Sequence, residues 1–123
     1  MIARTLDLEK DEIVEEMEKI GVDSGGIEIM KGKGEHILIR IDDIGVREAI
    51  ILKQEMLAAG GECAISMNAL SMKTNKTCAI VMGTVKQILH AIKKMSMQPF
   101  TCPKVGELLD EVIKNVNIKR VLS

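Results

Sequence analysis

A helical pattern that runs into two glycines and a short apolar strand, within residues 44–70, constrains the fold of this chain most strongly. Apolar residues recur at helical spacing from about residue 46 to residue 59. The residues expected on its buried side are Val46, Ala49, Ile50, Ile51, Leu52, Met56 and Leu57. Gly60 and Gly61 end the helix, because glycine adopts a left-handed helix cap without steric cost. A helix this apolar is expected to pack between a sheet and a second surface.

Residues 36–44 show the alternation of a half-buried strand. One face would carry Ile37, Ile39 and Ile41, and the other Leu38, Arg40 and Asp42. The apolar run 77–82 is typical of a central strand covered on both faces. Other expected strands are residues 2–6 and 63–67, whereas residues 27–30 fit either a strand or a helical turn. The expected helices are 9–20, 46–59, a segment from Thr84 through Met95, and an amphipathic C-terminal helix over 101–120.

This order of elements predicts an α/β (α+β) two-layer sandwich, with a four- to five-stranded mixed sheet and about four helices. A ferredoxin-like core, strand-helix-strand-strand-helix-strand, is the simplest template. A chain of 123 residues is long enough for one core, so residues 1–123 are expected to form a single domain.

The composition argues against two kinds of partner. The net charge is −1, which gives no electrostatic basis for binding nucleic acid or an anionic membrane. Phe100 is the single aromatic residue, so stacking platforms for single-stranded nucleic acid are absent. No apolar run reaches the length of a membrane span. Residues 1–12 also lack a signal-peptide pattern, which predicts a cytoplasmic protein with free thiols.

The residues that most often carry chemistry are scattered. His36 and His90 lie far from each other and from any cysteine pair, so we expect no metal and no cofactor. Cys63 and Cys78 lie in apolar strand patterns and are expected to be small core residues. A cysteine–histidine pair could form only through the fold. We therefore expect no catalytic residue and favour a protein that is not an enzyme.

Two groups of residues are candidates for binding a ligand or a partner. Gly83 and Thr84 join a strand end to a helix start, where free backbone N–H groups suit an anion, with the turn Gly60–Gly61 and Lys53 or Lys86 in support. The alternative is an ordinary capped helix, because Thr84 and Gln87 match a capping box. The second group is Lys53, Gln54 and Glu55 in the central helix, which is either its solvated side or a contact surface.

Three stretches, LKQEMLAAGGECAI (52–65), CAIVMGTVKQILHAIKKM (78–95) and QPF (98–100), carry a family resemblance, supported by DSGGIEIM (23–30). Together they resemble the N-terminal extension that precedes the catalytic barrel in some bacterial and archaeal dihydropteroate synthases. The resemblance runs from about Ile2 to Val112. The catalytic barrel needs about 200 residues or more, and its Asn-x-Thr-Pro-Asp-Ser-Phe loop has no counterpart here. No catalytic residue of the synthase can therefore be assigned in this chain.

The resemblance implies a non-catalytic accessory domain of folate or pterin metabolism. Its expected partner is either a dihydropteroate-synthase-type barrel protein or a second copy in a homodimer. The alternative function is a module that binds a small molecule such as a pterin, a nucleotide or another anion.

Overall fold

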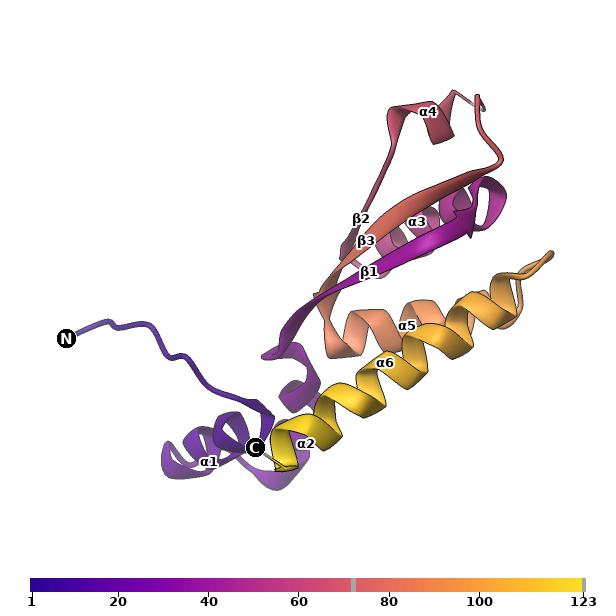
Figure 1. Ribbon diagram of the computed structural model, residues 1–123. Coiled ribbons are helices and arrows are strands. Elements are labelled where there is room, and N and C mark those ends of the chain that lie inside the picture. Colours follow the sequence, from indigo (N-terminus) through magenta and orange to yellow (C-terminus); the bar gives the residue numbers. More distant parts are fainter. Residues whose placement is uncertain (72, 123) are drawn as a thin grey trace. The chain divides into compact units, whose positions relative to one another are not determined.

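The computed structural model describes residues 1–71 and 73–122, and their side chains except those of Lys10, Leu70 and residues 116–122. The chain forms two compact units, Met1–Glu35 and His36–Ser123, which are described separately. Figure 1 shows their elements along the chain. The expectation of a single domain over residues 1–123 stays a prediction.

The first unit contains α1 (Lys10–Lys19), α2 (Ser24–Met30) and the short 3-10 helix η1 (Lys31–Lys33). Gly21 has a φ of 88° just after α1, in agreement with the predicted helix end. Residues 27–30 are helical because the Asp23 side chain accepts a hydrogen bond of 2.8 Å from the N–H of Gly26 and so caps α2. The strand expected over residues 2–6 was wrong. These residues are exposed and pair with none of the described strands.

The second unit is built on a sheet of β1 (His36–Gly45), β2 (Glu62–Ile65) and β3 (Lys76–Thr84). The strand order is β1-β3-β2, and β3 is antiparallel to both neighbours. In the described residues the sheet therefore has three strands and is antiparallel, which corrects the expected four- to five-stranded mixed sheet. Between Ile41 and Ile44 a β-bulge interrupts the register, with Asp43 at a φ of 57°.

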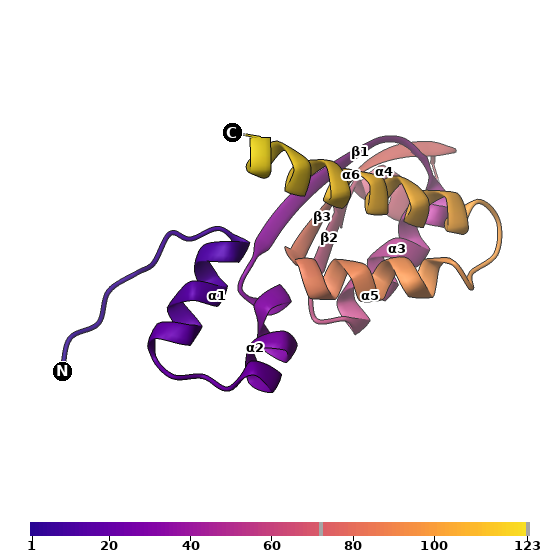
Figure 2. The same ribbon diagram turned by 90° about the horizontal axis from the view of Figure 1, so that it is seen from below.

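The helices α3 (Val46–Ala58), α5 (Val85–Met95) and α6 (Cys102–Leu122) cover one face of this sheet, and α5 and α6 lie side by side (Figures 1 and 2). The short α4 (Met67–Leu70) interrupts the segment between β2 and β3. One apolar core joins all these layers, and its fully buried large side chains include Leu52, Met56, Val81, Ile88, Met95 and Leu109. Each such side chain contributes about 1.5–3 kcal/mol of hydrophobic stabilisation.

The connectivity agrees in part with the ferredoxin-like template. The strands β1 and β2 run parallel to each other with β3 between them, as in a split βαβ unit. After α5, however, the described chain continues as the helix α6 and not as a fourth strand. Consequently β1 has no strand beyond it among the described residues, and one of its edges is open.

Several predicted burials were corrected. In α3, Leu57 is 49% exposed whereas Leu52 is completely buried. The central strand β3 is covered on one face only, since Ala79 and Val81 are buried whereas Cys78 is exposed. The sequence pattern of β3 is nearly all apolar and so could not distinguish its two faces. The apolar pattern of the predicted C-terminal helix places Val105, Leu108, Leu109, Val112, Ile113 and Val116 in one stripe. In α6 this stripe is buried at Val105, Leu109 and Ile113 but exposed at Leu108 and Val112. Val116, expected in the same stripe, lies outside the described side chains.

Candidate functional site

The polar trio in α3 divides among three environments. The Lys53 Nζ donates hydrogen bonds to the carbonyl oxygen of Cys63 at 2.8 Å and to Glu62 Oε1 at 3.3 Å, so it ties α3 to β2. Glu55 Oε1 accepts from Gln98 Nε2 at 3.2 Å, in the segment between α5 and α6. Gln54 is exposed. Two members of the trio therefore hold elements together, and the three do not converge on one surface point.

The glycines predicted for an anion site do come together at the start of α5. A Cβ on Gly60 would lie 3.1 Å from Gln87 Nε2, and one on Gly83 would lie 3.0 Å from Gln87 Oε1. Thr84 and Gln87 form the predicted capping box, with the Thr84 N–H donating to Gln87 Oε1 at 2.9 Å. The Gln87 side chain therefore lies against these glycines at the start of α5, and the anion site stays a prediction. Lys86 is exposed on the same helix.

A cavity of about 440 Å³ lies at the start of α3, on the side of the molecule where β1 ends and β3 begins. Three segments distant in sequence form its walls, and the lining residues are Gly45, Val46, Arg47, Glu48, Thr74, Asn75, Lys76 and Thr101. Two cations, Arg47 and Lys76, line it. The Arg47 guanidinium stacks over the Phe100 ring at 4.0 Å from the centroid, which fixes one wall.

Glu48 is the buried charge of this cavity, with 6% of the residue exposed. Burial raises the pKa of its carboxyl. Hydrogen bonds from its own backbone N–H and from the hydroxyl and N–H of Thr101 outweigh that effect and lower the pKa below the ordinary value of 4.5. Glu48 is therefore ionised at neutral pH and joins α3 to the start of α6. Together with Arg47 and Lys76 it leaves the cavity with a net positive charge.

Sequence reasoning missed this cavity. Gly45 followed by Glu48 three residues later is a helix-start pattern, and it was the one signal available. The contribution of residues 74–76 and of Thr101 depends on the tertiary fold. Such convergence has no local sequence signature.

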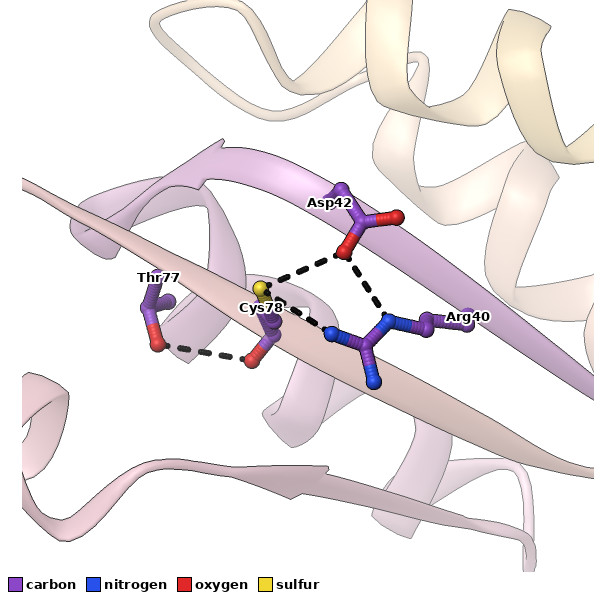
Figure 3. A network of polar contacts seen from close by, with 4 residues as sticks. All are labelled: Arg40, Asp42, Thr77 and Cys78. Carbon is purple, nitrogen blue, oxygen red and sulfur yellow. Dashed lines mark hydrogen bonds and ion pairs between the residues drawn. The ribbon is translucent and has the colours of Figure 1, made fainter.

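A polar cluster lies on the uncovered face of the sheet (Figure 3). The Arg40 Nε donates to Asp42 Oδ1 at 2.9 Å, and the Cys78 Sγ lies 3.4 Å from the same oxygen and 3.8 Å from Arg40 Nη2. The hydrogen bond from Arg40, followed by that from Cys78, lowers the pKa of the Asp42 carboxyl. Asp42 also raises the pKa of Arg40. The cluster is exposed, so its ion pair contributes little to stability.

Among the residues that the structure describes, no three histidine, cysteine, aspartate or glutamate side chains lie close enough together to hold a metal ion. Burial raises the pKa of Cys63 to about 11 and also raises the pKa of Cys102, so both thiols are protonated at neutral pH. The expectation of a core cysteine is confirmed for Cys63 and was wrong for Cys78, which points to the uncovered face. No described helix is long and apolar enough to cross a membrane.

A groove of about 290 Å³ follows the open edge of β1, between that strand and α6. Its walls include Ile39 and Ile41 from the strand and Leu108 and Val112 from the helix. Leu108 is 47% exposed and Val112 is 38% exposed. These four side chains are apolar, and the lining also includes the polar residues Arg40, Asp42, Glu111 and Asn115.

The described residues form a small α/β protein with a split βαβ sheet, a charged cavity and an open strand edge. Comparison with curated proteins finds similarity to two folate-pathway proteins. The chain is 33% identical over 102 residues to the probable bifunctional folylpolyglutamate synthase/dihydropteroate synthase of Halobacterium salinarum, which covers 82% of this chain and 12% of that protein. It is 25% identical over 107 residues to the bifunctional dihydropteroate synthase/dihydropteroate reductase of Helicobacter pylori, which covers 87% of this chain and 28% of that protein.

The similarity therefore spans most of this chain but well under a third of either relative. It supports a relation between this chain and a stretch of two folate-pathway proteins, in agreement with the resemblance seen in the sequence. No family model matches the chain. No solved structure matches it.

Proposed function

We propose that this chain is a non-catalytic accessory module of folate metabolism that docks on a dihydropteroate-synthase-type catalytic protein. The observation that carries the proposal is that both relatives are named as dihydropteroate synthases with a second activity, and that this chain matches only 12% and 28% of them. In those proteins the matching stretch is covalently joined to a much longer chain.

The architecture supports an accessory role. A synthase barrel needs eight parallel strands and about 200 residues or more. The described residues form an antiparallel sheet with the order β1-β3-β2. The Arg40, Asp42 and Cys78 cluster lacks a histidine or lysine that would serve as a general base near pH 7.

The docking surface that we propose is the uncovered face of β3 and β2. Ile80 and Met82 are partly exposed there, and Ala64 is exposed beside them on β2. Neighbouring strands of an antiparallel sheet with one uncovered face are normally polar on that face. Partly exposed apolar side chains on such a face are typical of a contact with another protein.

The test is a titration of the dihydropteroate-synthase-type protein from the same cells with the full chain, by isothermal calorimetry. Met82→Glu should weaken binding at least tenfold, since it places an unpaired carboxylate in the contact. Met97→Glu is the matched control, because Met97 is 64% exposed and belongs to the segment between α5 and α6, not to a strand of the sheet. Equal affinity for the two variants would reject this surface, and an absence of binding by the wild-type chain would reject the docking role.

The cavity at the start of α3 favours a second candidate function, the binding of a small anionic molecule such as a phosphorylated pterin or a nucleotide. Its volume of about 440 Å³ is in the usual range for small-molecule sites. Arg47 and Lys76 would bind the anionic group, and Asn75 and Thr101 offer hydrogen bonds to a planar ring.

Inorganic pyrophosphate and a pterin phosphate would serve as probes in a thermal-shift titration. A ligand at a hundred times its Kd should stabilise the chain by about 2.7 kcal/mol. Lys76→Ala should abolish the shift, whereas Lys93→Ala, an exposed lysine at the end of α5, should keep it. The prediction fails if millimolar probe leaves the midpoint unchanged. The expected absence of a cofactor and of catalytic residues, and the cytoplasmic location, stay predictions.

A further inference from the structure

The open edge of β1 begins with a regular stretch. Residues His36 to Ile41 pair in continuous register with β3, and the register shifts only beyond Ile41. The side chain of Asp42 lies on the uncovered face of the sheet, the same face as that of Arg40, with which it forms a hydrogen bond (Figure 3). The stretch in regular register is therefore residues 36–41, and Asp42 is the first residue of the bulge. An edge of this length with unpaired N–H and C=O groups can pair with another strand.

We propose that two copies of this chain associate through this edge, with their β1 strands antiparallel about a two-fold axis at Ile39. In that register, residues whose numbers add up to 78 lie opposite each other. Ile39 faces Ile39 of the second copy, and Ile37 faces Ile41. Leu38 faces Arg40, and His36 faces Asp42. The two sheets join into one, in the order β2-β3-β1-β1-β3-β2.

The uncovered face of the joined sheet is complementary to itself. No pair within residues 36–42 places like charges opposite each other. The imidazole of His36 meets the carboxylate of Asp42, which keeps its charge because its pKa is lowered. The aliphatic part of Arg40 covers Leu38, an otherwise unexplained apolar side chain that is 67% exposed. Charged residues on an edge usually prevent pairing between strands. Here they fit a second copy of the same strand.

The opposite face supplies apolar contacts. Ile37 and Ile41 are only partly buried and point to the helix side of the sheet. The groove between β1 and α6 lies next to them, with Leu108 and Val112 exposed along it. A second β1 strand would enter this groove and bring its own Ile37 and Ile41 against the two helix residues. The same association therefore covers the groove in both copies.

Other registers fit worse. An axis at Ile41 also brings Arg40 opposite Asp42, but the bulge at residues 42–43 then interrupts both strands one residue from the axis. An axis at Ile37 carries Arg40 beyond the end of the partner strand, opposite Gly34. The axis at Ile39 keeps Arg40 opposite a residue of the partner's β1 and leaves the bulge three residues from the axis. It also leaves the face of β3 and β2 uncovered, so the inference does not depend on the proposed docking.

The experiment is sedimentation equilibrium of the full chain in reducing buffer, over about 1 µM to 1 mM, a range that detects dissociation constants between about 1 µM and 1 mM. Reductant prevents disulfide links through the exposed Cys78. The wild-type mass should rise from 13.5 kDa towards twice that value as the concentration increases.

Leu38→Lys tests the register, because it places lysine opposite Arg40 at both symmetric positions and should weaken the dimer at least tenfold. The double variant Leu38→Lys/Arg40→Glu should restore the affinity, since lysine then faces glutamate. Exposure of Leu38 means that the Leu38→Lys monomer keeps its thermal midpoint. The double variant also loses the exposed ion pair between Arg40 and Asp42, which contributes little to stability, so its midpoint should fall only slightly. A chain that stays at 13.5 kDa throughout, a Leu38→Lys dimer of wild-type affinity, or a double variant without rescue would each overturn the proposal.

Discussion

The two strand-to-helix junctions of the second unit differ in their packing, although each helix carries a long polar residue, Glu48 or Gln87, at its third position. At the junction of β3 and α5, Thr84 and Gln87 cap the helix, and Gly60, Gly61 and Gly83 close around the Gln87 side chain. At the junction of β1 and α3, Gly45 has no side chain to cap the helix, and the Glu48 carboxylate lies against Gly45. A cavity lies beside Glu48, whereas the Gln87 side chain is packed against three glycines.

The difference comes from the segments that pack over each junction. The turn after α3 brings glycines against α5, and a glycine allows the backbone to approach closely. Residues 74–76 and Thr101 approach the start of α3 instead, where the Val46 N–H donates to the carbonyl oxygen of Asn75 at 3.0 Å, and they line the cavity. A helix start therefore becomes a filled contact or an open cavity according to its tertiary neighbours. The following variants test this contrast, starting with the largest expected effect.

Gly61→Ala should destabilise the protein by about 2–3 kcal/mol, the upper range for overpacking. A Cβ at this position would lie 2.8 Å from the carbonyl oxygen of Met82 and 2.7 Å from Met56 Cε. The carbonyl belongs to β3 and cannot move aside. Urea unfolding measures the loss. Gln54→Ala, an exposed change in α3, should stay within about 0.5 kcal/mol. If Gly61→Ala leaves the free energy of unfolding unchanged, the junction can accommodate a methyl group despite these short distances.

Glu48→Ala should cost about 2 kcal/mol, because it leaves the N–H and hydroxyl of Thr101 without the carboxylate that they bond. Glu48→Gln keeps the shape and an acceptor oxygen, so its loss should be about 1 kcal/mol. Thermal unfolding at pH 7 compares the two. Equal losses would mean that packing, and not hydrogen bonding, is the main contribution of Glu48 at the open junction.

Thr84→Ala should cost about 1 kcal/mol, the usual effect of losing a helix N-cap. The variant removes the acceptor of the 3.2 Å bond from the Gln87 N–H. Thr84→Ser retains a hydroxyl and serves as the control. Chemical denaturation measures the free energy of unfolding of both variants. A serine variant as unstable as the alanine variant would contradict a capping role for the Thr84 hydroxyl.

The stability of the wild-type protein should fall as the pH drops below about 4.5. Glu48 has a folded pKa lower than its unfolded value of 4.5, so the unfolded chain takes up a proton first and acid favours unfolding. Above pH 4.5 the contribution is complete. Glu48→Gln should reduce the slope of stability against pH in this window. The exposed Asp42 has a lowered pKa as well, so Asp42→Asn is the comparison and should change the slope less.

Much of the local structure was predictable from the sequence. The helix over residues 46–59 with its glycine stop, the alternation of Ile37, Ile39 and Ile41, and the Thr84–Gln87 capping box are all confirmed. These features depend on side-chain periodicity and on bonds between residues a few positions apart. Such interactions are encoded within one segment, so the sequence alone identifies them.

Tertiary structure alone decided the number of strands, the faces and the sites. Residues 2–6 found no partner strand, and the register of β3 against β1 placed Cys78 beside Arg40 and Asp42 on the uncovered face. The cavity at α3 required three segments distant in sequence to meet. Local patterns determine which segments become helices and strands, whereas the pairing of strands and the packing of loops depend on contacts between distant residues that no single segment contains.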